Sequence, residues 1–366
     1  MTKDLEGSRI LITGGAGFIG ANLVEACLRR GAGRVAVLDC LTYAANPLSL
    51  AWARQQKAFA FHQADVVDLP ACKKILAEVH PDWVFHLAAE SHVDRSIEQP
   101  LPFVRTNVQG TASLLQASLL HWQALPQSSQ DRFRFVHVST DEVFGSLEQD
   151  GYFREDTPVA PRSPYAASKA ASDHLVRAYG HTYGLPYSMT HCGNNFGPYQ
   201  FPEKLIPLMI LRALQGKSLP VYGQGINIRD WIQVEDHCQA LLQVAARGRA
   251  GQAYVIGARN DRPNLEVVEE ICEVVDRLGL TAPGVRQSRD LIRFVEDRPG
   301  HDFRYAIDPA KLERETGWRP QREFSQALHE TVLWYQENQP WVEECEKSYA
   351  GQRLGLGLTS PGGKSS

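Results

Sequence analysis

Short apolar runs alternate with amphipathic segments along the first third of the chain. The runs have the length and continuous apolar character of buried strands, and they cover 10–13, 34–38, 83–87 and 133–138. The amphipathic segments repeat apolar residues at helical spacing, and they cover 22–30, 72–79 and 103–120. Strands separated by helices predict βαβ units, and continuous apolar strands indicate a parallel sheet with helices on both faces.

The pattern changes after residue 195. Turn-forming and aromatic residues fill 196–204, and helical segments follow at 205–214, 234–246 and 265–278. The chain is therefore predicted to be an α/β protein. A Rossmann-type, doubly wound parallel sheet is expected over 8–195, with a return of the chain near 231–263. A smaller, mostly helical C-terminal lobe is expected over 196–345, and the glycine- and serine-rich segment 351–366 has the composition of a disordered tail.

Composition and charge exclude several classes of protein. The chain of 366 residues is 43% hydrophobic and 22% charged, which is ordinary for a globular protein. A formal net charge of -4 shows no basic excess, so no nucleic-acid partner is expected. The seven cysteines are scattered and include no C-x-x-C pair, so neither a disulfide framework nor a metal site is predicted. The first residues lack a secretory apolar segment and no stretch is long enough to span a membrane, so we expect a cytoplasmic protein.

A glycine-rich turn follows the first predicted strand and precedes a helix. Gly14, Gly17 and Gly20 give the spacing G-x-x-G-x-x-G. Glycine permits a tight turn, and the missing side chains let backbone amides approach a pyrophosphate at the start of the helix. The motif alone is also compatible with a glycine turn that binds no ligand, so the dinucleotide site depends on the residues that follow.

The second predicted strand ends in Asp39, about 20 residues after the turn. A carboxylate at this place can accept hydrogen bonds from the adenosine ribose, and it repels a 2′-phosphate. Cys40 follows where an NADP site usually has a basic residue, so NAD is the predicted cofactor. Asp65 and Val66 follow the third strand signal and are candidates for contact with adenine. Capping of a strand end is the alternative role of both aspartates.

Tyr165 and Lys169 form a Y-x-x-x-K pair. Residues four apart lie on one face of a helix, so the lysine ammonium can approach the tyrosine hydroxyl. A nearby cation favours the phenolate. We therefore expect the pKa of Tyr165 to fall below its usual value of about 10, and the residue to act as a general base. The spacing alone arises by chance in many chains.

Hydroxyl and carboxyl side chains follow the strand at 133–138. Thr140 stands at its carboxyl end, where parallel sheets bind ligands, and it can bond the substrate oxygen that Tyr165 deprotonates. Asp141 and Glu142 come next. Two adjacent acids beside a base can serve as proton donor and proton acceptor on one substrate. Taken singly, each residue is also compatible with a strand cap or a solvated turn.

Longer motifs add a family resemblance. They lie at 38–46, 86–96, 139–145, 194–207, 222–231 and 297–302. With the glycine turn and the Y-x-x-x-K pair, the layout resembles the extended short-chain dehydrogenase/reductase superfamily, and the finer motifs resemble the dTDP-glucose 4,6-dehydratase family. The resemblance extends from about residue 8 to about residue 340. Its most specific part is Thr140, Asp141 and Glu142, since sugar epimerases of the superfamily have a Ser-Ala-Thr type of sequence there.

The resemblance implies a redox-neutral dehydration of a nucleotide sugar. Tyr165 would take the proton of the sugar 4-hydroxyl while hydride passes from C4 to NAD, and the ketone would acidify the proton at C5. Glu142 would remove that proton, Asp141 would protonate the departing 6-hydroxyl, and the hydride would return to C6. dTDP-glucose would become dTDP-4-keto-6-deoxyglucose, so the enzyme would be an NAD-dependent hydro-lyase. The pathway that uses the product stays open between dTDP-rhamnose and other deoxysugars.

The resemblance also implies the site residues and a homodimer formed through helices of the first lobe. The catalytic residues would be Thr140, Asp141, Glu142, Tyr165 and Lys169. The residues that would contact NAD are Gly14, Gly17, Phe18, Ile19, Gly20, Asp39, Cys40, Leu41, Thr42, Asp65, Val66, Leu87, Ala88, Ala89, Thr106, Tyr165, Lys169 and Asn195. The residues that would contact the nucleotide sugar are Ser91, Thr140, Asn194, Lys204, Leu205, Pro220, Val221, Tyr222, Arg229, Asn264, Arg298, His301 and Tyr305. The two arginines suit a diphosphate, because guanidinium binds its oxygens through paired hydrogen bonds, although an ion pair is the alternative role of each.

Some positions depart from the family pattern, and one histidine is left out of the mechanism. Cys40 stands where many relatives have lysine, Ala45 where glycine is usual, and Gly193 where serine or cysteine is more familiar. His86, at a strand end, is predicted to be a packed core histidine. A UDP-glucose or other NDP-glucose 4,6-dehydratase is the first alternative, because the sequence does not show how the base is bound. A UDP-sugar 4-epimerase has no need of the acid pair, and a non-catalytic NAD-binding protein has no need of the catalytic residues.

Overall fold

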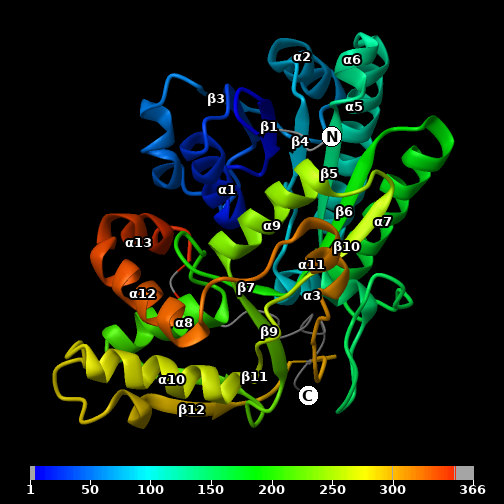
Figure 1. Cartoon of the computed structure of the whole chain (residues 1–366). Helices are drawn as coiled ribbons and strands as arrows, with labels where there is room; N and C mark the ends of the chain where they lie inside the picture. Colours follow the sequence, from blue (N-terminus) through cyan, green and yellow to red (C-terminus); the bar gives the residue numbers. More distant parts are fainter. Residues whose placement is uncertain (1–4, 299, 350, 352–366) are drawn as a thin grey trace, which may run out of the picture.

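The computed structural model describes residues 5–298, 300–349 and 351. Its largest element is a seven-stranded parallel sheet with the strand order β10-β6-β5-β4-β1-β2-β3 (Figure 1). The order reverses between β1 and β4, and doubly wound sheets bind ligands at the carboxyl ends of strands at such a point. The strands are β1 (Arg9–Thr13), β2 (Arg34–Asp39), β3 (Phe59–Gln63), β4 (Trp83–His86), β5 (Arg134–Thr140), β6 (Tyr187–Cys192) and β10 (Gln252–Ile256).

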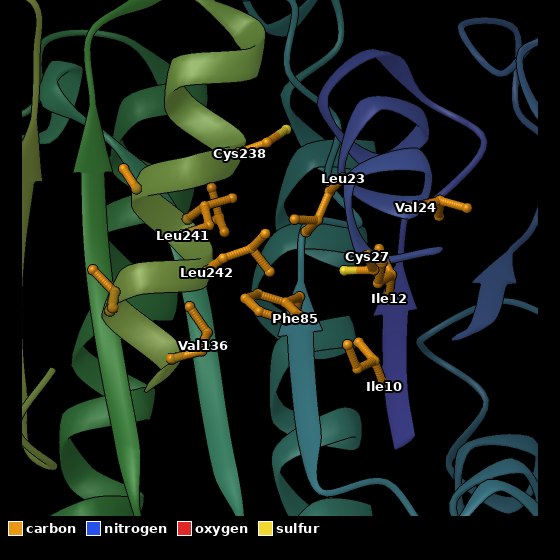
Figure 2. Close-up of a cluster of buried hydrophobic side chains, with 14 of the residues drawn as sticks. Ile10, Ile12, Leu23, Val24, Cys27, Phe85, Val136, Cys238, Leu241 and Leu242 are labelled. Atoms are coloured by element: carbon orange, nitrogen blue, oxygen red, sulfur yellow. The ribbon is translucent and has the colours of Figure 1, made fainter. Parts of the chain in front are cut away.

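Helices cover both faces of this sheet. Successive side chains of a strand point to opposite faces, so Ile10 and Ile12 belong to one buried cluster and Leu11 to another. Figure 2 shows the first cluster, in which Leu242 lies above Phe85. The helices of the first face are α1 (Phe18–Arg29) and α9 (Val234–Arg247), and those of the second are α2 (Leu69–Val79), α5 (Thr111–Ala124) and α7 (Pro164–Tyr183). Burial on both faces explains the continuous apolar strands.

The predicted sheet is confirmed, with differences at the ends of helices. The helix expected from residue 22 begins at Phe18, because Gly17 has an extended N-cap conformation with φ -81° and ψ 177°. The helix expected over 103–120 is divided into α4 (Pro100–Phe103), the π-helix η3 (Val104–Gly110) and α5. A π-helix shifts the register of side chains by one position, which the apolar pattern did not reveal.

A smaller lobe lies beside the sheet, below it in Figure 1. Its apolar core includes Ile210, Ile271 and Leu328. Its helices are α8 (Leu205–Leu214), α10 (Asn264–Arg277), α12 (Phe324–Glu337) and α13 (Gln339–Glu346). Two small sheets, β11-β9-β7 and β12-β8, are formed by β7 (Asn194–Phe196), β8 (Leu219–Tyr222), β9 (Ile228–Gln233), β11 (Asp261–Pro263) and β12 (Ile292–Val295). Between β9 and β11, the chain returns to the large sheet through α9 and β10.

Short helices complete the described chain. They are α3 (Val93–Glu98), α6 (Gln127–Gln130), α11 (Ala310–Thr316) and the 3-10 helices η1 (Pro47–Leu50), η2 (Ala53–Gln55), η4 (Asp141–Phe144) and η5 (Ser288–Leu291). Among the described residues, none of the helices combines the length and the apolar character that crossing a membrane requires. Of the tail predicted at 351–366, all but Gly351 lies outside the described residues.

Candidate active site

A cavity of about 800 Å³ lies at the carboxyl ends of β1, β4 and β5. Its walls come from the loops after these strands, from the start of α7 and from the segment that precedes α8. Thr140, Tyr165 and Lys169 line it together with Gly14 and Asn195. The cavity therefore occupies the point at which the strand order reverses.

The glycine turn after β1 is shaped by close backbone contacts. Gly14 has a φ of +71°, and a Cβ there would come within 2.7 Å of the Ala88 backbone nitrogen. A Cβ on Gly20 would overlap the carbonyl oxygen of Gly14. Gly17 has more room, because its Cβ would lie 3.4 Å from the same oxygen. The first N–H groups of α1 have no acceptors within the helix, so the turn fits a pyrophosphate.

Asp39 is held by backbone N–H groups on both of its carboxylate oxygens. Oδ2 accepts from the Ala16 N–H at 2.9 Å, and Oδ1 accepts from the Leu41 N–H at 2.8 Å. Burial raises the pKa of Asp39, and these two hydrogen bonds oppose the rise. Each oxygen keeps a further lone pair for a ribose hydroxyl, so the site fits the adenosine half of NAD.

The cavity brings together most of the residues predicted to contact NAD. The lining includes Gly14, Gly17, Phe18, Ile19, Gly20, Asp39, Cys40, Thr42, Asp65, Val66, Leu87, Ala88, Ala89, Thr106, Tyr165, Lys169 and Asn195. Leu41 is not among the lining residues and contributes its N–H to Asp39. Asp65 has the turn-capping role as well, since it accepts the Val67 N–H at 3.0 Å.

Tyr165 and Lys169 stand one turn apart near the start of α7. Ser163 caps this helix by accepting the Ala166 N–H at 3.1 Å. The ammonium of Lys169 donates to the carbonyl oxygen of Val138 at 2.8 Å. The lysine is therefore fixed against β5, and both side chains reach the cavity.

The predicted fall in the pKa of Tyr165 is wrong for the protein alone. Burial and the neighbouring Glu142 raise the pKa of Tyr165 well above 10. A hydrogen bond with the Thr140 hydroxyl opposes this rise. Burial also lowers the pKa of Lys169. The loss of solvation is the largest cause of the rise, and helical spacing alone did not reveal how deeply the pair is buried.

Asp141 and Glu142 have different surroundings although they are adjacent. Asp141 is 2% exposed, and its Oδ2 has no hydrogen-bond partner within the described part of the chain. Burial, followed by the charge of Glu142, raises the pKa of Asp141 well above its usual value. Burial raises the pKa of Glu142 too, but Arg298, Lys204 and Arg229 oppose that rise. Burial raises the pKa of both acids, but three cations oppose the rise at Glu142, so Asp141 is the acid with the stronger preference for the protonated form.

Three cations reach Glu142 from three parts of the chain. Arg229 stands on β9, and its guanidinium carbon lies 4.2 Å from the centroid of the Tyr305 ring. Arg298 pairs with a carboxylate of α3 at 3.1 Å. Lys204 precedes α8 and donates to a carbonyl oxygen of the loop after β4 at 2.9 Å. These contacts connect the two lobes around the acid pair.

The residues predicted to bind the nucleotide sugar form two groups. Ser91, Thr140, Asn194 and Lys204 line the cavity. The second group belongs to the smaller lobe beyond the cavity lining and contains Leu205, Pro220, Val221, Tyr222, Arg229, Asn264, Arg298, His301 and Tyr305. Within it, the rings of Tyr222 and His301 meet edge to face at 6.5 Å. The cations around Glu142 link the second group to the first.

The sequence patterns did not indicate a polar cluster in the cavity wall. Glu203 is 8% exposed and accepts hydrogen bonds from the Arg95 guanidinium at 3.0 Å and the Tyr43 hydroxyl at 3.1 Å. The same guanidinium lies 3.9 Å from the centroid of the Tyr43 ring. These residues are far apart in the chain and belong to no common motif, so no local signal relates them.

Two further sequence predictions concern His86 and Gly193. His86 is 1% exposed and bonds the hydroxyls of Thr13 at 2.8 Å and Thr111 at 2.9 Å, so the packed core histidine is confirmed. A Cβ on Gly193 would come within 2.8 Å of the Asp230 carbonyl oxygen. This chain leaves no space there for the serine or cysteine of the family pattern.

Comparisons with known proteins agree with this site. A family model for GDP-mannose 4,6 dehydratase matches residues 11–331. A dTDP-glucose 4,6-dehydratase of Neisseria meningitidis serogroup B is 51% identical over 352 residues, which cover 95% of this chain and 99% of that protein. The dTDP-glucose 4,6-dehydratase 1 of Escherichia coli K12 is 50% identical over 347 residues, which cover 92% and 95%. The chain belongs to the dTDP-glucose 4,6-dehydratase family.

A solved structure of the same family has the same fold. The crystal structure of DesIV, a dTDP-glucose 4,6-dehydratase from Streptomyces venezuelae with NAD and TYD bound, has a TM-score of 0.83 and 45% sequence identity. The match covers 91% of this chain and 98% of that chain. Membership of the dTDP-glucose 4,6-dehydratase family confirms the resemblance predicted from the motifs.

Proposed function

We propose that this protein is an NAD-dependent hydro-lyase that converts dTDP-glucose into dTDP-4-keto-6-deoxyglucose with loss of water. The observation that carries the proposal is the pair of Asp141 and Glu142 beside Tyr165, in which the pKa of Asp141 is raised well above its usual value and three cations oppose the rise at Glu142. An elimination across C5 and C6 needs an acid and a base in addition to Tyr165, whereas a 4-epimerisation has no need of this second acid–base pair. The relatives named dTDP-glucose 4,6-dehydratase support the choice of substrate.

The first step is oxidation at C4 of the sugar. Bound NAD supplies a hydride acceptor for this carbon, a hydride donor for C6 later, and the positive charge of its nicotinamide ring. Tyr165 takes the proton of the 4-hydroxyl, and the Thr140 hydroxyl bonds the same oxygen. Because burial raises the pKa of Tyr165, its phenolate needs positive charge nearby, and the ammonium of Lys169 supplies part of it.

The second step is elimination across C5 and C6. The ketone at C4 acidifies the proton at C5, and Glu142 takes that proton in its carboxylate form, which three cations stabilise against the effect of burial. Asp141 gives its proton to the 6-hydroxyl, which leaves as water. When C6 is reduced, Glu142 returns a proton to C5, so that the ring carbon regains its hydrogen.

One turnover leaves a proton to be moved from Tyr165 to Asp141. Tyr165 has gained the proton of the 4-hydroxyl, and Asp141 has lost one to the departing water. The hydroxyl of Thr140 joins the two groups, because it donates to Asp141 Oδ1 at 3.2 Å and bonds the phenol oxygen of Tyr165. A proton that passes through Thr140 returns both groups to their starting states.

The nucleotide base is tested by substrate choice. Purified protein is incubated separately with dTDP-glucose, UDP-glucose and CDP-glucose, and the 4-keto-6-deoxy product is measured. We expect product with dTDP-glucose and a much lower rate with the other two. Product with UDP-glucose alone would contradict the dTDP assignment, and no product with any of the three would contradict the dehydratase.

The role of Glu142 is tested by its glutamine variant. Glu142→Gln keeps the size of the side chain and removes the base, so we expect oxidation at C4 to proceed and NADH absorbance to accumulate on the protein without release of product. Glu148→Gln is the matched control, because Glu148 is an exposed acid that follows the same helix η4. Normal turnover by Glu142→Gln would rule out its role as the base.

We also propose that the protein is a cytoplasmic homodimer formed through α5 and α7. The exposed apolar residues Leu120 (42% exposed) and Tyr183 (49% exposed) support this interface, and the ring of Tyr183 lies 5.1 Å from that of Tyr179. Light scattering after gel filtration is expected to give twice the chain mass of 40.8 kDa. Leu120→Asp is expected to shift the protein toward the monomer, and a monomeric parent protein would contradict the proposal.

We propose a division of the chain that follows its chemistry. Residues 8–195, with the return near 231–263, form the NAD-binding domain, and residues 196–345 form the lobe that holds the nucleotide sugar. The placement of Asp39 in the first part and of Arg229 and Arg298 in the smaller lobe supports this division.

A further inference from the structure

A buried carboxylate lies one helical turn beyond Lys169. Asp173 is 3% exposed, and its two oxygens accept three hydrogen bonds. The donors are His137 Nε2 at 3.1 Å, Ser139 Oγ at 3.0 Å and His191 Nε2 at 3.1 Å. His137 and Ser139 stand on β5, and His191 stands on β6 directly beside Ser139. Asp173 therefore attaches α7 to two neighbouring strands of the sheet.

This cluster keeps a net negative charge. Burial alone would raise the pKa of Asp173, but the hydrogen bonds from the two histidines hold it well below its usual value. Burial, together with the nearby Lys169, lowers the pKa of His137 to about 4. The Nδ1 atoms of His137 and His191 are buried without a partner among the described residues, so a second proton on either ring would lack an acceptor. The His137 ring therefore donates as a neutral imidazole near neutral pH, and it does not cancel the carboxylate charge.

Lys169 is the cation that this charge acts on. Its side chain is 5% exposed, and burial lowers its pKa. Asp173 is the strongest of the groups that oppose this fall, and Cys192 is the next. Burial raises the pKa of the Cys192 thiol to about 12, so that group is neutral near physiological pH. Of these two groups, Asp173 is therefore the one whose negative charge acts on Lys169 near physiological pH.

Other titratable groups approach Lys169 from the surrounding elements. His86 on β4, His137 on β5 and Cys192 on β6 interact with its charge. Tyr165 on α7, Asp141 and Glu142 on η4, and Arg105 on η3 line the same cavity as Lys169, and His191 on β6 bonds Asp173. Burial lowers the pKa of His86 well below its usual value, so this ring is neutral. Arg105 pairs with Asp65 at 2.9 Å. The two acids of η4 act on Tyr165, whereas Asp173 acts on Lys169.

We propose that Asp173 is a positioning residue for the Tyr165–Lys169 pair. It fixes α7 on β5 and β6, and its buried negative charge keeps Lys169 in the ammonium form. The inference rests on the proposed function, because the ammonium matters for turnover only if Tyr165 is the base. The protonation of Lys169 can nevertheless be measured without turnover.

The test measures the protonation of Lys169 directly. The NAD-loaded protein is labelled with carbon-13 at the lysine ε carbons, and the Lys169 signal is assigned by its loss in Lys169→Met. We expect the parent protein to keep the ammonium up to at least about pH 8, and Asp173→Asn to lower the pKa of Lys169 by about 1 or more, because a nearby opposite charge is removed. The basic limb of the kcat profile should move to lower pH by the same amount, with KM for the nucleotide sugar unchanged.

A matched variant separates charge from attachment of the helix. Ser139→Ala removes one hydrogen bond to Asp173 and leaves its charge, so we expect a lower melting temperature with the Lys169 titration in its original place. An unchanged Lys169 titration in Asp173→Asn would overturn the proposal, and so would an equal shift in Ser139→Ala. If Asp173→Asn does not fold, the titration of Lys169 in the parent protein still tests the proposal. A neutral Lys169 amine below about pH 8 would show that the charge of Asp173 does not keep Lys169 protonated. A protein that dehydrates none of the nucleotide sugars would refute the proposed function and leave the titration result standing.

Discussion

Asp141 and Glu142 share a peptide bond, yet at Glu142 the three cations Arg298, Lys204 and Arg229 together oppose the rise in pKa that burial causes. Asp141 is buried behind it with Oδ2 unpartnered in the described residues, and burial with a like charge favours its neutral form. The sequence predicted an acid and a base at these positions. Which of the two favours the proton follows from cations that the chain brings from other elements.

Removing one of these cations should move the acid limb of activity. Glu142 must be ionised to act, so turnover falls as pH falls through its pKa. Arg298→Gln removes the cation that lowers this pKa most, so the acid limb of kcat is expected to move to higher pH by about 1. The measurement is kcat at saturating substrate from about pH 5 to about pH 9. KM should rise as well, because Arg298 is proposed to bind the diphosphate.

The control for this variant is Arg293→Gln, an exposed arginine on the neighbouring strand β12. It removes the same charge from the protein surface and should leave the profile in place. If the acid limb of kcat does not move in Arg298→Gln, ionisation of Glu142 is not what limits turnover at low pH.

At the scale of elements, the glycines of the turn after β1 have two different roles: two of them permit close backbone packing, and the third leaves room for a ligand. Gly14 and Gly20 lack side chains because backbone atoms of the turn and of the loop after β4 occupy the space. Gly17 has room for a Cβ beside the start of α1, so its missing side chain serves the approach of a pyrophosphate. The sequence indicated the spacing but not this difference.

Two alanine variants should separate these tasks. In Gly20→Ala the Cβ overlaps backbone that cannot move without opening the turn, so we expect a loss of about 2 kcal/mol or more in the free energy of unfolding, together with loss of bound NAD. Gly17→Ala should fold with nearly the parent stability and bind NAD more weakly. Chemical unfolding and a count of bound NAD per chain measure the two effects. Equal stability losses in both variants would contradict the distinction.

At the scale of the whole molecule, the C-terminal helix α13 attaches the smaller lobe to the loop after β2. Trp341 is 5% exposed, and its indole N–H donates to the Ser49 hydroxyl at 2.8 Å. The Asn46 side chain donates to the Trp341 carbonyl oxygen at 3.1 Å. Trp341 and Ser49 are 292 residues apart in the chain, so their contact joins an early segment to a late one.

Trp341→Ala should therefore destabilise the whole protein. Loss of a buried aromatic side chain costs about 3 to 5 kcal/mol, and this one also leaves Ser49 without its donor. Phe294→Ala is the control, because Phe294 is 60% exposed and its loss should change stability by about 0.5 kcal/mol or less. Urea unfolding compares the two variants. A loss for Trp341→Ala no larger than the control would show that α13 adds little to the fold.

The buried histidines predict how stability depends on pH. His86, His92, His137 and His237 are buried and have pKa values lowered by desolvation, to about 2 for His92, about 4 for His137 and about 3 for His237. Below about pH 6.5 the unfolded chain takes up protons that the folded protein cannot hold. Stability then falls with pH, by about 1.4 kcal/mol per pH unit for each ring.

Carboxyl groups with raised pKa values, such as Asp230 at about 6, oppose this fall because the folded protein binds their protons more tightly. The large rises among the described carboxyl groups are those of Asp141 and Asp230. The four rings outnumber these two groups, so the melting temperature should be lower at about pH 5.5 than at about pH 7. A melting temperature that stays level or rises over this interval would contradict the prediction.

The sequence by itself determined the sheet and the glycine turn, and it predicted the Asp39 site and the catalytic residues, because each prediction depends on residues close together in the chain. Strand and helix periods, loop chemistry and residues four apart on a helix are local properties, and they are written in the order of residues. The tertiary structure decided the protonation states. Burial raised the pKa of Tyr165 against the prediction, and cations from distant elements set Glu142 apart from Asp141. It also placed Asp173 beneath Lys169 with donors from two strands. Desolvation and charge act through space, so they depend on which distant segments the fold brings together.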